Sequence, residues 1–148
     1  MEFKVCSSAF EDGGYLPGWY SSSGLNASPP FGWAEEPEGT KSFALVCVSS
    51  EGKVHWVLWN IPLDKKSVYG RLAAERNLSG GMHQGVNDLL ATGWTGPIEK
   101  LPDFILHFTL YALDSVVKLE EQDVTAEILE KAMDGHILGI AKLECNYS

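Results

Sequence analysis

Residues 42–48 read Ser-Phe-Ala-Leu-Val-Cys-Val, and residues 54–61 read Val-His-Trp-Val-Leu-Trp-Asn-Ile. Both segments are rich in β-branched and aromatic residues, which favour strands, and neither has a regular alternation of apolar and polar positions. Nearly continuous apolar strands are typical of a sheet that is buried on both faces. The polar connection Ser49-Ser50-Glu51-Gly52 between them, and Pro62 after the second, predict a hairpin at the centre of the fold.

Two further strands and one helix are expected towards the C-terminus. Phe104 to Leu113 is a third strongly apolar segment, and Ile137 to Leu143 is a fourth. Between them, Thr125 can cap a short helix and Gly135 can supply the left-handed residue that ends it. The apolar stripe of this helix consists of Ile128, Leu129, Ala132 and Met133. Several strands and one late helix predict an all-β or α+β domain.

The remaining segments are less regular. The first 40 residues are rich in Gly, Ser and Pro, a composition that is typical of loops and short edge strands. Residues 63–102 contain repeated glycines and are expected to form a long irregular crossing, a kind of segment that often carries function. Within it, Gln84 and Asp88 are expected to hold the crossing by hydrogen bonds. No repeat or linker divides the chain, so a single domain over residues 1–148 is predicted.

Composition and charge exclude several classes of partner. The 148 residues include 20 acidic and 11 basic side chains, which gives a net charge of −9. Such a chain is a poor partner for nucleic acid or an anionic lipid surface, because both require clustered cations. No apolar segment approaches the roughly 20 residues that span a bilayer, and no leader-like start is apparent, so no membrane insertion and a cytoplasmic location are expected. The three cysteines are expected to be reduced thiols.

The residues that could carry chemistry do not form a familiar catalytic or metal-binding motif. The sequence has no GxSxG, P-loop, HExxH or dinucleotide fingerprint, and its four histidines lack metal-ligand spacing. We therefore expect no catalytic residue, no metal and no cofactor. An enzymatic alternative would need a nucleophile–base pair, and only Ser49 or Ser50 with His55 could supply one.

Eight segments of the chain, taken in order, match the sequence motifs of one family. They are Ser7–Gly14, Ser28–Trp33 (SPPFGW), Pro37–Ser42 (PEGTKS), Val54–Pro62 (VHWVLWNIP), Gln84–Asp88 (QGVND), Gly96–Pro97, Phe108–Asp114 (FTLYALD) and Ala132–Leu138 (AMDGHIL). Together they resemble the phosphatidylethanolamine-binding proteins, in particular the bacterial Raf-kinase-inhibitor-like branch, in which the first segment is the opening strand. The resemblance implies an antiparallel β-sandwich, with a large central sheet, a smaller sheet and a short C-terminal helix.

The resemblance also implies a small cavity that binds phosphate-like anions. In the family, its walls come from a DPDAP turn, the histidine of the VHW strand, and the His and Tyr of an HRY motif. His55 retains the strand histidine, and Pro30, Gly96 and Pro97 retain neighbouring positions. Trp94 occupies a position that is often tyrosine. Taken alone, His55 could equally line a pocket or pack in the core.

The polar side chains of the implied cavity are largely replaced. Ser49 and Glu51 occupy the places of two turn aspartates, while Phe104 and Leu106 occupy those of the HRY histidine and tyrosine. His107 cannot substitute, because strand alternation directs it to the opposite face. A phosphate dianion without partners would be costly to desolvate in the resulting apolar cavity. The candidate ligand-binding residues are Pro30, Ser49, Glu51, His55, Trp94, Gly96, Pro97, Phe104 and Leu106.

Two functions from different classes remain in competition. The first is a non-enzymatic binding protein with a degenerate small-anion or phosphate-headgroup pocket, which takes a small anionic or apolar ligand. The second is a protein-interaction or inhibitor module, acting in kinase or protease regulation, with a vestigial pocket. A protein partner or a homodimer would then be bound through exposed aromatics, for which Trp19, Trp59 and Trp94 are candidates. An enzyme is the third and least favoured hypothesis.

Overall fold

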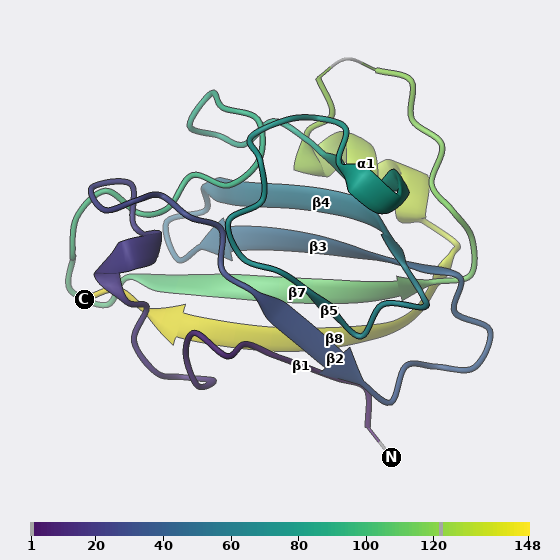
Figure 1. Cartoon of the computed structure of the whole chain (residues 1–148), viewed down its shortest axis with the longest axis horizontal. Helices are drawn as coiled ribbons and strands as arrows, with labels where there is room; N and C mark the ends of the chain where they lie inside the picture. The colour runs from purple at the N-terminus through teal and green to yellow at the C-terminus, as the bar shows by residue number, and fades with distance from the viewer. Residues whose placement is uncertain (1, 122) are drawn as a thin grey trace.

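Two antiparallel sheets and one α-helix make up the fold, in a computed structural model that describes residues 2–121 and 123–148 (Figure 1). The strands of the larger sheet lie in the order β6-β4-β3-β7-β8, and their bounds are His83–Gln84, Val54–Pro62, Ser42–Ser49, Ile105–Leu113 and Ile137–Asn146. The smaller sheet has the order β1-β2-β5, with bounds Lys4–Cys6, Phe31–Ala34 and Ser67–Val68. The smaller sheet lies across one face of the larger one, and the helix α1, Ala126–Met133, lies on the other. The predicted β-rich sandwich with a short C-terminal helix is confirmed.

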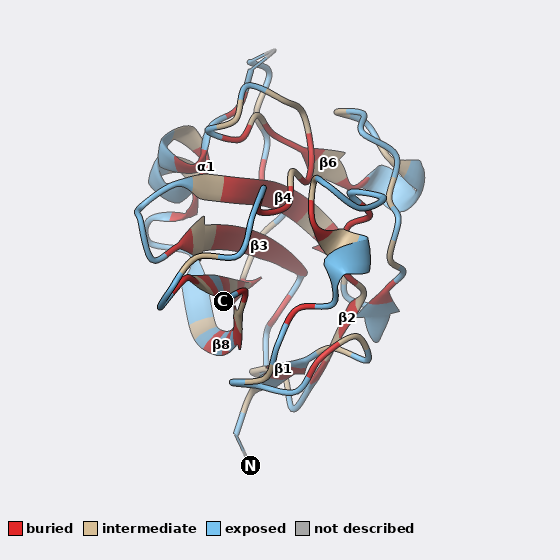
Figure 2. Ribbon diagram, turned by 90° about the vertical axis from the view of Figure 1, so that its left-hand side faces the viewer, coloured by how far each residue is buried: buried red, intermediate tan, exposed pale blue. Residues whose placement is uncertain are grey.

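The central hairpin is buried on both faces, as its apolar sequence predicts (Figure 2). Trp56 belongs to the core cluster between the two sheets, where its ring packs edge to face with that of Phe31, with 5.8 Å between the ring centroids. Trp59, three residues further along β4, belongs to the cluster beneath α1. Both tryptophans are fully buried. Trp59 was expected among the exposed aromatics, and this expectation is wrong because β4 has no solvent-facing side.

The C-terminal helix and strand follow their sequence signals closely. The side chain of Thr125 accepts a hydrogen bond from the Ile128 backbone N–H at 3.3 Å, and Gly135 has a φ of +83° just after the helix. Strand β8 continues to Asn146, three residues beyond the predicted end, because it pairs along the whole length of β7. The alternation of buried and exposed residues persists through Cys145 and therefore could have predicted the longer strand.

The N-terminal strand lies earlier than expected. Ser7–Gly14 was expected to be the opening strand, but β1 is Lys4–Cys6 and residues 7–14 form turns. The Ser7 hydroxyl donates to the Pro30 carbonyl at 2.6 Å and accepts from the Ala9 N–H at 3.0 Å, which bends the chain directly after β1.

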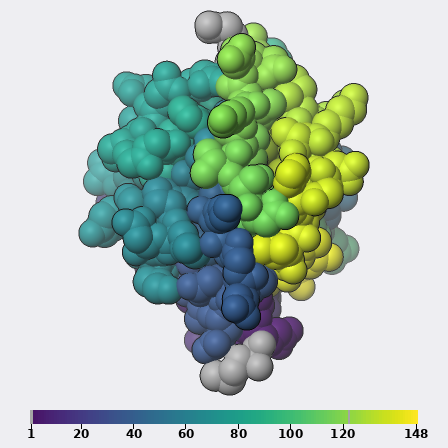
Figure 3. Space-filling view, turned by 90° about the vertical axis from the view of Figure 1, so that its right-hand side faces the viewer, coloured from purple at the N-terminus to yellow at the C-terminus, as the bar shows by residue number. Residues whose placement is uncertain are grey.

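The crossing from β4 to β7 is irregular, as predicted, apart from two two-residue strands and a 3₁₀ turn at Ser79–Gly81. Arg76 joins this crossing to the next loop by donating to the carbonyls of Leu119 and Glu121, each at 3.0 Å. On one face of the molecule, the crossing (teal), the loop after β7 (green) and the C-terminal region (yellow) lie side by side (Figure 3). Within residues 2–121 and 123–148, no helix has the length and apolar character needed to cross a membrane.

Candidate functional site

His55 of β4 lines a small cavity at the end of the central hairpin. The cavity has a volume of about 150 Å³, and the histidine residue is only 4% exposed. The His55 Nδ1 atom lies 2.6 Å from the Thr95 carbonyl oxygen, and the Thr95 N–H donates to the His55 carbonyl at 3.1 Å. A carbonyl can only accept, so Nδ1 carries a proton and donates it to Thr95. In the neutral ring, Nε2 is then the acceptor.

Burial keeps the His55 ring neutral. Desolvation, the largest cause, lowers the pKa of His55 below its usual value of 6.5. The hydrogen bond to the Thr95 carbonyl raises this pKa, Lys53 lowers it, and Asp88 and Glu51 raise it, but burial outweighs the causes that raise it. An uncharged imidazole is the dominant form near neutral pH.

The walls of the cavity are mainly apolar and their rim is charged. Three segments meet there: the turn between β3 and β4, the irregular crossing, and the residues that precede β7 (Figure 1). The apolar lining consists of Leu89, Pro97, Ile98, Leu101 and Phe104. The charged residues are Glu51, Lys53 and Glu99, all of them exposed. The cavity therefore combines one buried imidazole with an apolar wall and a rim that holds two carboxylates and one ammonium group.

Four of the predicted site residues lie together at this cavity, namely Glu51, His55, Pro97 and Phe104. Phe104 packs edge-on against the His55 ring, with 6.2 Å between the ring centroids. Five further lining residues were not predicted from the sequence, namely Lys53, Leu89, Ile98, Glu99 and Leu101. Lys53 could have been found because it lies two residues before His55, next to the start of β4, where strand alternation directs both side chains to the same side. The others depend on the path of the crossing.

Two predicted residues, Ser49 and Leu106, lie outside this lining. The Ser49 hydroxyl accepts hydrogen bonds from the backbone N–H groups of Glu51 at 3.2 Å and Lys53 at 3.3 Å, which shapes the hairpin turn. Leu106 is fully buried in the core between the sheets and pairs with Ser49 across β3 and β7. Both residues support the site from the sheet beneath it.

Trp94 lies behind His55. It is buried, with its ring centroid 6.4 Å from that of His55, and its indole N–H donates to the Tyr20 carbonyl at 3.0 Å. The expectation that Trp94 is an exposed contact for a partner is therefore wrong, because the N-terminal segment covers it.

The other two predicted residues, Gly96 and Pro30, have packing roles. A Cβ atom on Gly96 would lie 2.1 Å from the Tyr20 carbonyl oxygen, so the close approach of two backbones requires glycine there. Pro30 lines a separate hollow between the two sheets, of about 10 Å³.

Asn87 holds the turn that carries Thr95. Its side-chain oxygen accepts from the N–H groups of Leu89 at 2.9 Å and Ala91 at 3.2 Å. Its amide group donates to the Gly93 carbonyl at 3.0 Å and to the Thr95 hydroxyl at 2.9 Å. Because the side chain is only 3% exposed, these four hydrogen bonds fix the turn, and with it the acceptor for His55.

Gln84 and Asp88 anchor the crossing, as expected. The Gln84 side chain accepts from the Trp56 indole N–H at 2.8 Å and donates to the carbonyls of Ala73 at 2.8 Å and Glu75 at 3.0 Å. The Asp88 carboxylate accepts from the Val54 N–H at 2.8 Å.

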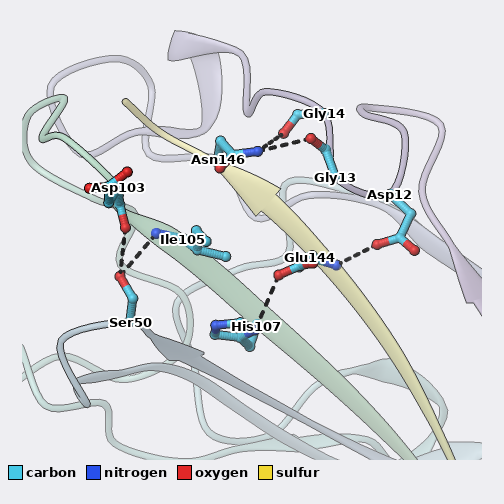
Figure 4. A network of polar contacts seen from close by, with 9 residues as sticks. All are labelled: Asp12, Gly13, Gly14, Ser50, Asp103, Ile105, His107, Glu144 and Asn146. Carbon is cyan, nitrogen blue, oxygen red and sulfur yellow. Dashed lines mark hydrogen bonds and ion pairs between the residues drawn. The ribbon is translucent and has the colours of Figure 1, made fainter.

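The two serines and His107 contact groups other than His55, and Figure 4 shows the contacts of Ser50 and His107. The Ser50 hydroxyl lies between the Asp103 carbonyl at 3.4 Å and the Ile105 N–H at 3.0 Å. No hydrogen bond joins either serine hydroxyl to His55 in the described part of the chain. His107 pairs with Glu144 at 3.5 Å on the outer side of the sheet, on the opposite face from Phe104 and Leu106, as alternation predicts. Among residues 2–121 and 123–148, no three His, Cys, Asp or Glu side chains are grouped to hold a metal ion.

Comparison with known proteins identifies the family. The sequence profile of the phosphatidylethanolamine-binding proteins matches residues 6–148. A UPF0098 protein from Methanothermobacter thermautotrophicus is 40% identical over 139 residues, which cover 91% of each chain. A UPF0098 protein from Chlamydia muridarum is 33% identical over 97% of each chain.

Solved structures agree with the sequence comparison. A Chlamydia trachomatis protein assigned as a homologue of phosphatidylethanolamine-binding protein superposes with a TM-score of 0.85 at 30% identity, over 99% of this chain and 97% of its own. YbcL of E. coli, described as a new member of the mammalian family, superposes with a TM-score of 0.88 at 26% identity, over 100% and 99% of the two chains. This chain belongs to the phosphatidylethanolamine-binding protein family.

Proposed function

We propose that this protein is a non-enzymatic binding protein, and that the cavity beside His55 takes a small and largely apolar ligand. The observation that carries the proposal is the lining, in which five apolar residues surround one buried imidazole. Small-molecule sites are commonly apolar with a few placed polar groups. A volume of about 150 Å³ suits a small ligand.

A phosphate dianion suits this cavity poorly. Among the described residues that line it, Lys53 is the single cation, and Glu51 and Glu99 line the same cavity. The neutral His55 ring uses its N–H on Thr95 and so has no donor left for an anion. An anion that enters would lose its water and gain few donors in exchange.

The absence of catalysis is part of the proposal and is supported by the geometry around His55. A hydrolytic mechanism needs the imidazole to accept a proton from a neighbouring nucleophile. The hydroxyls of Ser49 and Ser50 instead make hydrogen bonds to the backbone of the hairpin turn and of the segment before β7. A reduced, cytoplasmic setting is also proposed, and it agrees with the free thiols of Cys6, Cys47 and Cys145.

Titration with two probes tests the binding proposal. We expect 1-butanol to shift the imidazole resonances of His55 and the methyl resonances of Leu89 and Leu101, whereas inorganic phosphate leaves them unchanged at the same concentration. The substitution Leu101→Trp should fill the cavity and abolish the butanol shifts, while Leu138→Trp on strand β8 should leave them intact. Shifts of His55 that saturate with phosphate at lower concentration than with butanol would overturn the proposal.

The alternative of a protein-interaction module is favoured by one surface feature. Trp19 is 51% exposed and Leu25 is 58% exposed, and the Leu25 N–H donates to the Trp19 carbonyl at 3.2 Å, so the two apolar residues belong to one turn. We expect a homodimer or a protein partner bound through this turn to be weakened by Trp19→Ser. Sedimentation that shows a monomer for both the wild-type protein and this variant, with no bound partner in either, would contradict the alternative.

A further inference from the structure

We propose that the His55 cavity selects a primary alkylammonium, a small cation with an apolar tail, over neutral and anionic ligands of equal size. The inference rests on the proposed binding function and deepens it by naming the class of ligand. Two observations carry it: the hydrogen-bonding state of the His55 ring, and the sign of the charge at the cavity rim.

The ring presents an acceptor to the cavity. The Nδ1 proton of His55 is held by the Thr95 carbonyl at 2.6 Å, and Thr95 is itself fixed by its N–H to the His55 carbonyl and by its hydroxyl to Asn87. In the part of the chain that the structure describes, Nε2 of His55 has no hydrogen-bond partner. This atom lines the open side of the cavity, where a ligand that donates can take the place of water on it. An ionised carboxylate can only accept, so it is rejected at this atom.

The rim favours a positive charge. The carboxylates of Glu51 and Glu99 oppose the single ammonium group of Lys53, which leaves a net negative charge around the entrance. The whole chain carries a net charge of −9, so its wider field has the same sign. Because the rim carboxylates are exposed, the gain is modest, and we expect an alkylammonium to bind about two- to fivefold more tightly than the matching alcohol.

The apolar wall accounts for the tail. Leu89, Ile98 and Leu101 line the cavity beside Phe104, so a short alkyl chain can be buried while the head group reaches His55 and the rim. A linear chain of four carbons with one terminal nitrogen matches the small volume. The proposed binding function therefore depends on the apolar wall, which contacts the alkyl tail. The proposed preference for a cation depends on the charged residues of the rim.

The pH dependence of binding has opposite signs for cations and anions. The charged groups that face or surround His55 are Lys53, Glu51, Glu99 and Asp88. Protonation of His55 as the pH is lowered removes the acceptor and adds a like charge. Alkylammonium binding therefore falls as the pH is lowered, whereas anion binding would rise.

The experiment compares n-butylammonium, 1-butanol and butyrate by NMR titration of the intact protein at pH 7.5 and pH 5.5. The expected order of affinity at pH 7.5 is butylammonium, then butanol, then butyrate, with butylammonium weakened at pH 5.5. The double variant Glu51→Gln/Glu99→Gln should remove the preference for butylammonium and leave butanol binding unchanged. Glu127→Gln on the exposed face of α1 is the matched control and should have no effect.

Three results would overturn the inference alone: butanol binding as tightly as butylammonium, butyrate binding the most tightly, or butylammonium binding that strengthens at pH 5.5. Each of these leaves a ligand in the cavity and so leaves the proposed function standing. If none of the three probes binds, the proposed function itself fails, and this inference fails with it.

Discussion

Replacing Asn87 by alanine should destabilise the protein and release the His55 ring from its fixed state. The Asn87 side chain is 3% exposed and makes four hydrogen bonds, all to the turn of residues 89–95. Each such bond contributes about 0.5–1.5 kcal/mol net, and buried groups left without a partner cost more. Because some of the released backbone groups can reach water, we expect the free energy of unfolding to fall by about 2–4 kcal/mol.

The effect on the site separates this prediction from simple destabilisation. Without the Asn87 amide, the Thr95 hydroxyl loses its donor, and the Thr95 carbonyl is no longer held 2.6 Å from Nδ1 of His55. Urea unfolding measures the stability, and the ¹⁵N shifts of the His55 imidazole report which ring nitrogen carries the proton. We expect a single Nδ1–H form in the wild-type protein and a mixture of both tautomers in the variant.

Asp88→Asn is the matched control for this substitution. Asp88 is exposed and accepts one hydrogen bond, from the Val54 N–H, which an amide oxygen can also accept. We expect a loss of less than about 0.5 kcal/mol and no change of tautomer. An Asn87→Ala variant that behaves like this control would refute the claim that Asn87 positions Thr95 and His55.

Three further predictions concern pH, the core and a glycine. Because burial lowers the pKa of His55, the unfolded chain takes up a proton at this residue before the folded chain does, so the free energy of unfolding should fall as the pH drops below about 6.5. The urea midpoint of the His55→Gln variant should depend less on pH than that of the wild-type protein, and an equal dependence in both would contradict this. Leu106→Ala should cost about 2–5 kcal/mol by urea unfolding, and a loss below about 1 kcal/mol would disagree with full burial of Leu106. Gly96→Ala should lower the melting temperature through a loss of about 1–3 kcal/mol, since its Cβ would lie 2.1 Å from the Tyr20 carbonyl oxygen; an unchanged melting temperature would show that the backbones can separate.

The central sheet could be predicted from the sequence because its signals are local and strong. The continuous apolar segments of β3 and β4 predict strands that are buried on both faces, and the short polar turn between them predicts a hairpin. The helix could be predicted for the same reason, since Thr125 and Gly135 mark both of its ends. The position of β1 could not, because residues 1–14 lack a clear period and a side-chain bond from Ser7 decides where the strand stops.

The cavity could be predicted only in part, because strand alternation gives the face of a side chain and not its depth. Phe104 and Leu106 share a face, as expected, yet Phe104 lies at the cavity and Leu106 lies one step further into the core. The lining from Leu89, Ile98 and Leu101 depends on the path of the long crossing, which hydrogen bonds of Gln84 and Asn87 determine. No periodic pattern in the sequence encodes that path.

The most direct test of the account is a crystal structure of the protein grown without phosphate, in which matched crystals are soaked with 1-butanol and with inorganic phosphate. The account predicts density for butanol in the cavity, with its hydroxyl within hydrogen-bond distance of Nε2 of His55 and its chain against Leu101 and Phe104. It predicts the same cavity free of phosphate at equal concentration. Ordered phosphate bound to His55, with the ring turned away from Thr95 to donate to it, would contradict the account.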